Sequence, residues 1–150
     1  MTLTVRRAHP EDANAVRDLV HASYALYLER MEREPAPMGA DYPTLISNHF
    51  VTMVQKGSEI AGIMVCYPRD DALHVENIAV GPAYQGQGIG KLLMKHAEEQ
   101  AQCLNISRIE LYTHEVMTEN IPFYEALGFY IRDRGKQDGY ERLFFEKTLK

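Results

Sequence analysis

A glycine-rich turn between a strand and a helix is the feature of this sequence that most directly suggests chemistry. Gly86, Gly88 and Gly90 follow the apolar run 78–80 and open an amphipathic segment, residues 88–104. Glycine has no side chain, so backbone N–H groups can approach an anion there. A helix beginning at the same point adds partial positive charge. The segment predicts a site for a phosphate or pyrophosphate group; the alternative is a tight turn that only caps the helix.

Two common phosphate-binding loops do not fit this spacing. A P-loop needs Gly-x-x-x-x-Gly-Lys-Ser/Thr, but Leu92 follows Gly90 and Lys91, and Gln85 stands where the first glycine belongs. The dinucleotide fingerprint Gly-x-Gly-x-x-Gly fails as well, because the third glycine falls one residue early.

The segment instead resembles the GNAT superfamily of acyl-CoA-dependent N-acetyltransferases. Gln85-x-x-Gly88-x-Gly90 matches the Arg/Gln-x-x-Gly-x-Gly/Ala signature of that family. Residues 73–80 resemble its fourth strand, and residues 119–129 resemble its Asn…Phe-Tyr-x-x-x-Gly-Phe motif. These stretches follow the family's order over about residues 70–130. The resemblance implies an enzyme that transfers the acetyl group of acetyl-CoA to a primary amine of a small molecule or peptide.

The resemblance also implies which residues hold acetyl-CoA. The loop amides would bind the pyrophosphate, and strand backbone would pair with the pantetheine arm like an added strand. Tyr124 would in addition protonate the departing thiolate, with helix packing as its alternative role. The expected cofactor-binding residues are Ile78, Ala79, Val80, Gln85, Gly86, Gln87, Gly88, Ile89, Gly90, Lys91, Asn120 and Tyr124.

The reaction also needs a base, because an alkylammonium group with a pKa of about 10 must lose a proton before it attacks. Glu76, two residues before Ile78, is the first candidate, acting directly or through a water. His74 alternates onto the same strand face and is the second candidate. A solvated strand residue is the alternative for Glu76, and deprotonation in bulk solvent is the alternative for both.

The acceptor pocket is expected from the first helix and the segment that follows it. Aromatic walls and one carboxylate suit a cationic amine. Packing of the helix onto the sheet is the alternative role for the same side chains. The candidates are Tyr24, Tyr27, Met38, Asp41 and Tyr42.

Periodicity along the chain predicts the elements that must position these residues. Strands are expected near residues 3–5, 50–55, 60–67, 73–80, 108–113, 129–132 and 140–148, and helices near 9–27, 41–48, 88–104 and 119–127. The proline-containing segment 34–39 predicts an irregular connection without helix. The order predicts one α/β domain, residues 1–150, of the α+β type. The expected domain has a mixed, mostly antiparallel central sheet of six to seven strands flanked by about four helices. The resemblance implies that this is the GNAT-like fold.

Composition limits the classes of function. The chain has 150 residues, 45% of them hydrophobic, and a formal net charge of −5, which argues against a nucleic-acid partner. Two cysteines without a Cys-x-x-Cys motif predict neither a disulfide framework nor a metal site. No apolar run is long enough to span a bilayer, so a cytoplasmic protein without a membrane partner is expected.

Three readings of the function stay open at this point. One is the amine acetyltransferase, and a second is an acyl-CoA-binding sensor without turnover. A third is an acetyltransferase acting on a protein N-terminus or on lysine. A homodimer is compatible with each of them.

Overall fold

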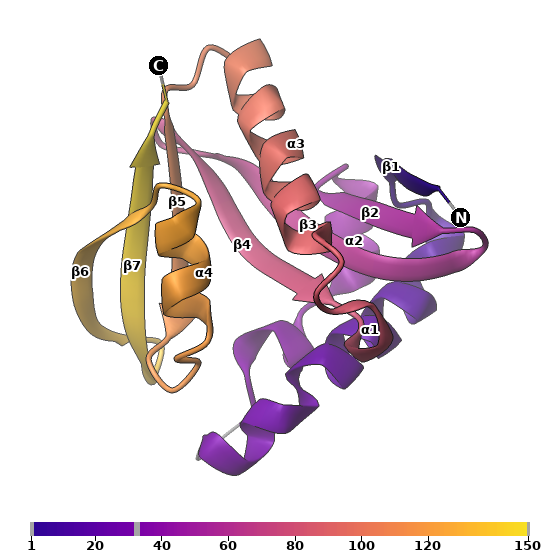
Figure 1. The fold of residues 1–150 in the computed structure, drawn as a ribbon, viewed down its shortest axis with the longest axis horizontal. Coiled ribbons are helices and arrows are strands. Elements are labelled where there is room, and N and C mark those ends of the chain that lie inside the picture. Colours follow the sequence, from indigo (N-terminus) through magenta and orange to yellow (C-terminus); the bar gives the residue numbers. More distant parts are fainter. Residues whose placement is uncertain (1, 32–33, 150) are drawn as a thin grey trace. The chain divides into compact units, whose positions relative to one another are not determined.

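The computed structural model describes residues 2–31 and 34–149 of the chain (Figure 1). Within these residues the strands are β1 (Leu3–Arg7), β2 (Val51–Lys56), β3 (Glu59–Arg69), β4 (Ala72–Val80), β5 (Arg108–His114), β6 (Tyr130–Gln137) and β7 (Tyr140–Thr148). The α-helices are α1 (Ala13–Tyr24), α2 (Tyr42–Ser47), α3 (Ile89–Cys103) and α4 (Asn120–Ala126).

The seven described strands form one sheet in the order β1-β2-β3-β4-β5-β7-β6. β4 and β5 pair in parallel over residues 73–75 of β4. The pairs β1–β2, β2–β3, β5–β7 and β6–β7 are antiparallel. The prediction of a mixed, mostly antiparallel sheet with about four helices is therefore confirmed.

The chain forms two compact units. Unit 1 comprises residues 1–66 and 77–95, and unit 2 comprises residues 67–76 and 96–150. The strand β4 and the helix α3 each contribute residues to both units. The prediction that the whole chain is a single domain stays a prediction.

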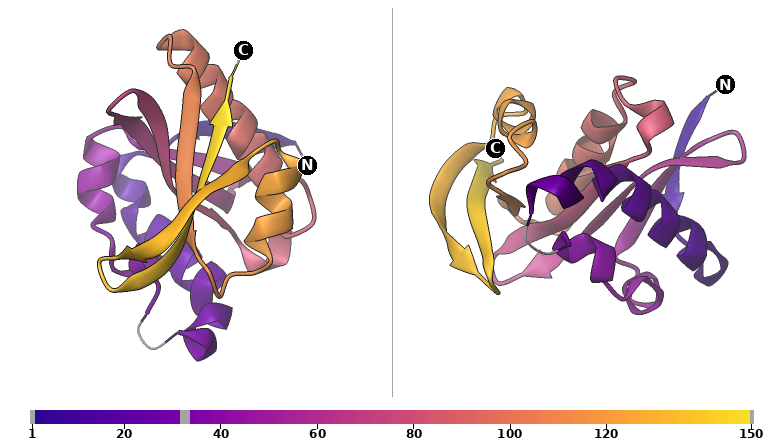
Figure 2. Two further views of the ribbon diagram at one scale, coloured as in Figure 1. Left: turned by 90° about the vertical axis from the view of Figure 1, so that its left-hand side faces the viewer. Right: turned by 90° about the horizontal axis from the view of Figure 1, so that it is seen from below.

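Unit 1 contains helices whose buried faces follow the apolar spacing of the sequence. α1 buries Val16, Leu19 and Val20, which recur at helical intervals. α1 and α2 pack against each other (Figure 2). Asp41 caps α2, because its Oδ1 accepts a hydrogen bond from the backbone N–H of Thr44 at 3.2 Å. Local sequence signals therefore account for the start of α2 as well as for the face that α1 buries.

Two predicted helical boundaries in unit 1 differ from the structure. The helix expected over residues 9–27 is divided into a 3₁₀ turn at Pro10–Asp12, α1, and a 3₁₀ stretch at Ala25–Arg30. The prediction that residues 34–39 exclude helix is wrong, since Ala36–Gly39 form a 3₁₀ turn. Proline is compatible with the first helical position because its missing N–H would have no partner there.

Unit 2 has an apolar and a polar sheet face. Ile109, Leu111, Leu143 and Phe145 are buried on β5 and β7. The Tyr124 ring of α4 lies 5.4 Å from the Phe145 ring.

α4 ends at a left-handed glycine turn, because Gly128 has φ +95° and the N–H of Phe129 donates to the carbonyl of Tyr124 at 3.1 Å. The turn fixes where the chain enters β6.

The β6–β7 hairpin is longer than the sequence predicts. β6 extends to Gln137, whereas the pattern predicts a strand only over residues 129–132 (Figure 2). Most of β6 is exposed, so its sequence lacks the alternation that marks a half-buried strand. Its pairing with β7 decides its length.

No helix among the described residues is long and apolar enough to cross a membrane.

Candidate active site

The glycine turn before α3 has an open and left-handed backbone. Gly86 and Gly88 both have φ +81°, a region that side chains with a Cβ rarely adopt. A Cβ placed on either residue would meet no atom within 4 Å, so conformation rather than packing requires glycine here. Both residues are exposed. The space above the turn can therefore receive a ligand.

The first turn of α3 carries backbone donors that have no partner in the helical ladder. The first intrahelical bond runs from the N–H of Leu92 to the carbonyl of Gly88, at 3.0 Å. The N–H groups of Ile89, Gly90 and Lys91 therefore precede the hydrogen-bonded ladder. Such donors at the start of a 15-residue helix attract an anion. The residues present fit the diphosphate of a coenzyme.

Unit 1 holds the start of α3 close to the sheet. A Cβ on Gly62 of β3 would lie 2.6 Å from Cγ2 of Ile89 and 3.1 Å from the carbonyl oxygen of Ala79, so only glycine permits this approach. The Nζ of Lys56 also donates to Oε1 of Gln87 at 3.1 Å. The β2–β3 hairpin thus contacts the start of α3 through Gly62 and the glycine turn through Lys56.

The end of β4 is joined to the α1–α2 region through Asn77. The hydroxyl of Tyr24 donates to Oδ1 of Asn77 at 2.5 Å and approaches the carbonyl of Ile78 at 3.4 Å. The side-chain amide of Asn77 donates to the hydroxyl of Tyr42 at 3.3 Å, and that hydroxyl donates to the carbonyl of Pro37 at 2.6 Å. The sequence gives no sign of this bridging role of Asn77, because its partners come from other elements.

The residues predicted to contact an acceptor have other contacts in unit 1. Tyr42 is 1% exposed, and Asp41 caps α2. The carbonyl of Met38 lies 2.8 Å from Nε2 of His21. The rings of Tyr24 and Tyr27 are 5.9 Å apart. Their role in acceptor binding stays a prediction.

Unit 2 holds Asn120 and Tyr124 at the start and in the body of α4. The side-chain amide of Asn120 donates to Oγ1 of the buried Thr113 at 2.9 Å. The Tyr124 ring is buried among Phe123, Phe129 and Phe145, with ring centroids 5.0–5.8 Å away. Aromatic packing therefore fixes the ring of Tyr124, and its chemical role stays a prediction.

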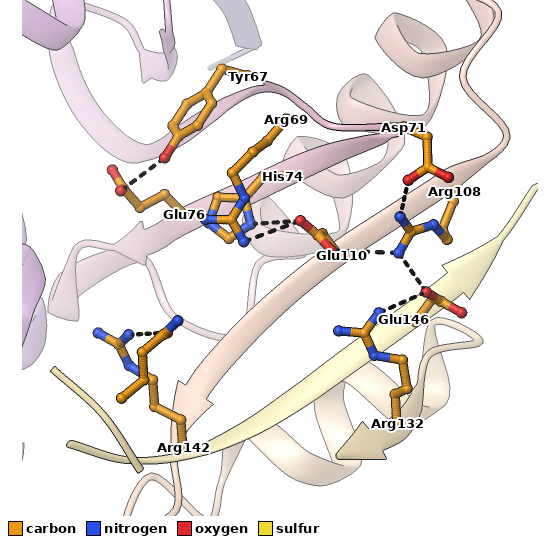
Figure 3. A network of polar contacts seen from close by, with 11 residues as sticks. Tyr67, Arg69, Asp71, His74, Glu76, Arg108, Glu110, Arg132, Arg142 and Glu146 are labelled. Carbon is orange, nitrogen blue, oxygen red and sulfur yellow. Dashed lines mark hydrogen bonds and ion pairs between the residues drawn. The ribbon is translucent and has the colours of Figure 1, made fainter. Parts of the chain in front are cut away.

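The two candidate bases lie next to Tyr67 in unit 2 (Figure 3). The hydroxyl of Tyr67 donates to Oε1 of Glu76 at 3.1 Å. The His74 ring lies 5.5 Å from that of Tyr67. Burial and the Glu76 carboxylate raise the pKa of Tyr67 to about 12, so its phenol keeps the proton that it donates to Glu76. The half-buried Glu76 is thus held by a neutral donor.

His74 is fully buried, at 1% exposure. Its Nδ1 lies 3.5 Å from Oε1 of Glu110, and neither ring nitrogen has a hydrogen-bond partner among the described residues. Burial, assisted by Arg69 and Arg142, lowers the pKa of His74 to about 4. A group with this pKa is a weak base at neutral pH.

The burial of His74 predicts that acid destabilises the protein. Folding lowers the pKa of this residue from its usual 6.5 to about 4, so below pH 6.5 protons bind the unfolded chain more tightly. The free energy of unfolding keeps its full value above pH 6.5. It decreases as the pH falls towards 4, by a total on the order of 3 kcal/mol. Urea unfolding of wild type and His74→Phe at pH 7, 5.5 and 4.5 measures it. Equal pH dependence in the two proteins would contradict this assignment.

Potential metal donors and the two cysteines can also be placed among the described residues. No group of three or more His, Cys, Asp or Glu side chains could hold a metal ion there. Cys66 is buried, and burial raises the pKa of its thiol to about 12. Cys103 is exposed at the end of α3.

The chain belongs to the Acetyltransferase (GNAT) family, whose sequence model matches residues 14–129. It is 34% identical over 61 residues to glucosamine 6-phosphate N-acetyltransferase of Trypanosoma brucei brucei, covering 41% of this chain and 40% of that protein. It is 30% identical over 92 residues to streptothricin acetyltransferase of Streptomyces lavendulae, covering 61% of this chain and 49% of that protein. The matches thus span less than half the length of these two relatives.

The fold is that of solved acetyltransferases. PaiA N-acetyltransferase from Thermoplasma acidophilum, in complex with coenzyme A, superposes with a TM-score of 0.84 over 99% of both chains at 20% identity. The GNAT-like fold predicted from the sequence motifs is therefore confirmed.

Proposed function

We propose that this protein is an acetyl-CoA-dependent N-acetyltransferase that acetylates a primary amine of a small molecule or peptide. The observation that carries the proposal is the open turn at Gly86 and Gly88, which leads into the unpaired N–H groups of α3 in a chain of the GNAT family. Two of the proteins named above are N-acetyltransferases and the third is an acetyltransferase, which supports the same reaction. A cytoplasmic location and action as a monomer or homodimer both agree with this function.

The residues proposed to hold the coenzyme are those that the family resemblance implies, and the free backbone donors before α3 support the part at the glycine turn. The N–H groups from Gly86 to Lys91 would bind the pyrophosphate, with Gln85 beside them. The β4 backbone at Ile78, Ala79 and Val80 would pair with the pantetheine arm. Asn120 would contact the coenzyme from α4. When bound, acetyl-CoA supplies an activated acetyl thioester.

Glu76 is the proposed base. A hydrogen bond from Tyr67 orients its carboxylate, and the group is half-buried rather than sealed from the acceptor. His74 is the weaker candidate, because burial lowers its pKa to about 4. Glu76 would take the proton from the amine nitrogen, directly or through a water, as the new N–C bond forms.

Tyr124 is the proposed acid. The C–S bond of the thioester breaks as the amide forms, and the electron pair goes to sulfur. The phenol of Tyr124 would give its proton to that sulfur, so that the free thiol leaves. Glu76 then releases its proton to solvent and the Tyr124 phenolate takes a proton from solvent, which restores both residues and balances the reaction.

Replacing Gly88 by glutamate is expected to weaken coenzyme A binding by about 100-fold. A side chain at φ +81° costs about 1–2 kcal/mol, and the carboxylate repels the pyrophosphate. Isothermal titration calorimetry with coenzyme A measures the affinity. Gly88→Ala isolates the backbone strain, and Gln87→Glu isolates the charge in the same exposed turn. Unchanged affinity in Gly88→Glu would remove the turn from the coenzyme site.

The proposed function is tested by turnover. Purified protein is incubated with acetyl-CoA and panels of polyamines, amino acids, aminosugars and peptides, and the free coenzyme A thiol is detected. We expect acceptor-dependent release of thiol and an acetylated product in mass spectra. Tight coenzyme A binding without turnover of any acceptor would identify an acyl-CoA-binding sensor instead.

A further inference from the structure

One sheet face of unit 2 carries a row of aromatic rings with a carboxylate and a guanidinium beside it. The Tyr67 and His74 rings are 5.5 Å apart, and so are the His74 and Tyr112 rings. The Tyr67 hydroxyl donates to Glu76 beside this aromatic row. The guanidinium carbon of Arg142 lies 3.9 Å from the Tyr112 ring centroid.

The aromatic row follows from strand alternation. His74 of β4 is in register with Glu110 of β5, and Arg142 of β7 is in register with His114 of β5. Tyr112 lies between these two positions on β5, so residues at every second position of three strands share the face. At neutral pH His74 carries no charge, so the row between Glu76 and Arg142 is uncharged.

Arg142 is unusual among the arginines of unit 2, because it is 5% exposed and its ion-pair partner, Asp138, is exposed. Its Nη1 donates to the neutral amide oxygen of Gln137 at 2.6 Å, and the nearest ion pair is with Asp138 at 3.6 Å. The Asp138 side chain is 80% exposed. Within the described residues, Nε and Nη2 of Arg142 donate to no acceptor.

The other arginines of this face are paired more closely. Arg69 donates to Glu110 at 3.2 Å, and Arg108 donates to Glu146 at 2.7 Å (Figure 3). Buried charges in proteins are normally paired, because an uncompensated one is costly to remove from water. A planar guanidinium with donors left over matches the oxygens of a carboxylate or phosphate. Arg142 therefore keeps donors available for an anion beyond its long ion pair with the exposed Asp138.

We infer that the acceptor is an amine that also carries an anionic group, a carboxylate or a phosphate, and that Arg142 binds that group. This inference rests on the proposed function, since it assigns the amine end of the same acceptor to Glu76. The charges of Glu76 and Arg142 both act on the phenol of Tyr112, so the two groups lie beside the same ring. Arg142 thereby becomes a specificity-determining residue for acetyl transfer.

The experiment compares acceptors that differ only in the anionic group. One pair of pools is the protein amino acids against their carboxamides, and a second pair is glucosamine 6-phosphate against glucosamine. Acetyl transfer is followed as kcat/KM at fixed saturating acetyl-CoA. Wild type is expected to favour the anionic member of one pair by about 10- to 100-fold, the range of a hydrogen-bonded charge. The pair that shows the preference identifies carboxylate or phosphate.

Substitutions assign the preference to Arg142. Arg142→Gln is expected to raise KM for the anionic acceptor by about 10- to 100-fold and so abolish the preference. Arg142→Lys keeps the positive charge but lacks the planar set of guanidinium donors, so it should retain part of the preference. It replaces Arg142→Gln in the experiment if the glutamine variant does not fold. Arg69→Gln is the matched control, since it removes an arginine that is already paired with Glu110 on the same face. The control should keep the full preference.

Three results would overturn the inference alone. Equal kcat/KM for both members of both pairs would do so while leaving the proposed function intact. So would a preference that survives in folded Arg142→Gln, or one that Arg69→Gln abolishes equally. Coenzyme A binding without acetyl transfer to any acceptor would overturn the proposed function, and the inference with it.

Discussion

Glu76→Gln is expected to lower kcat/KM at pH 7 by about 10²- to 10⁴-fold, the usual contribution of a positioned general base. Glutamine keeps the size of the side chain and can still accept the hydrogen bond from Tyr67. It cannot take a proton from the amine. The loss should therefore fall on the chemical step, while coenzyme A affinity stays at the wild-type value. Steady-state kinetics from pH 6 to 10, with calorimetry for binding, measure both.

The pH profile distinguishes Glu76 from its alternatives. At high pH the amine is already deprotonated in solution, so activity of Glu76→Gln should partly recover there. His74→Phe is the control, because it removes the competing base on the same strand and keeps a ring between Tyr67 and Tyr112. If the fall in activity at low pH disappears in His74→Phe and remains in Glu76→Gln, the assigned roles are reversed. If both variants keep it, deprotonation occurs in bulk solvent.

Tyr124→Phe is expected to lower kcat by about 10²- to 10⁴-fold with unchanged coenzyme A affinity. The phenylalanine ring keeps the contacts with Phe123, Phe129 and Phe145, so stability should change by about 1 kcal/mol or less. Pre-steady-state kinetics of thiol release isolate the chemical step from product release.

Tyr130→Phe is the matched control for Tyr124→Phe. It removes the hydroxyl of an exposed residue on β6, which donates to Glu146 of β7. We expect full activity in this variant. A chemical step in Tyr124→Phe as fast as in wild type would leave Tyr124 as a packing residue.

Local patterns in the sequence predicted the strand, glycine turn and helix between residues 72 and 103 within one or two residues. The reason is that each part has its own short-range signal: alternation in β4, glycine at the turn, and apolar spacing in α3. The left-handed backbone at Gly86 and Gly88 is also a local property, and glycine is the residue that adopts it readily.

Features that depend on a single turn or on pairing were predicted less well. The 3₁₀ turn at Ala36–Gly39 needs only short bonds such as the one from Met38 N–H to the Pro35 carbonyl, at 3.0 Å. Proline at the start does not prevent such a bond. The length of β6 was underestimated because its partner β7, rather than its own pattern, specifies it.

The aromatic row, with Glu76 and Arg142 beside it, can be predicted from the sequence only in part, for the same reason. Glu76 and His74 were found because they precede a recognisable motif on one strand. Tyr67, Tyr112 and Arg142 come from β3, β5 and β7, and only the register of the sheet brings them together. Arg142 itself carries no clear local sign, since it stands between Glu141 and the apolar run 143–145 of β7.

The contrast between the two cysteines decides how thiol reagents behave with this protein. Cys66 is hidden and stays protonated, since burial raises the pKa of its thiol to about 12, whereas Cys103 is exposed at the last residue of α3. A colorimetric assay for released coenzyme A will therefore also count Cys103, and Cys103→Ser removes that background. The same asymmetry allows the wild-type chain to carry one fluorophore or spin label at a known position, with no cysteine introduced.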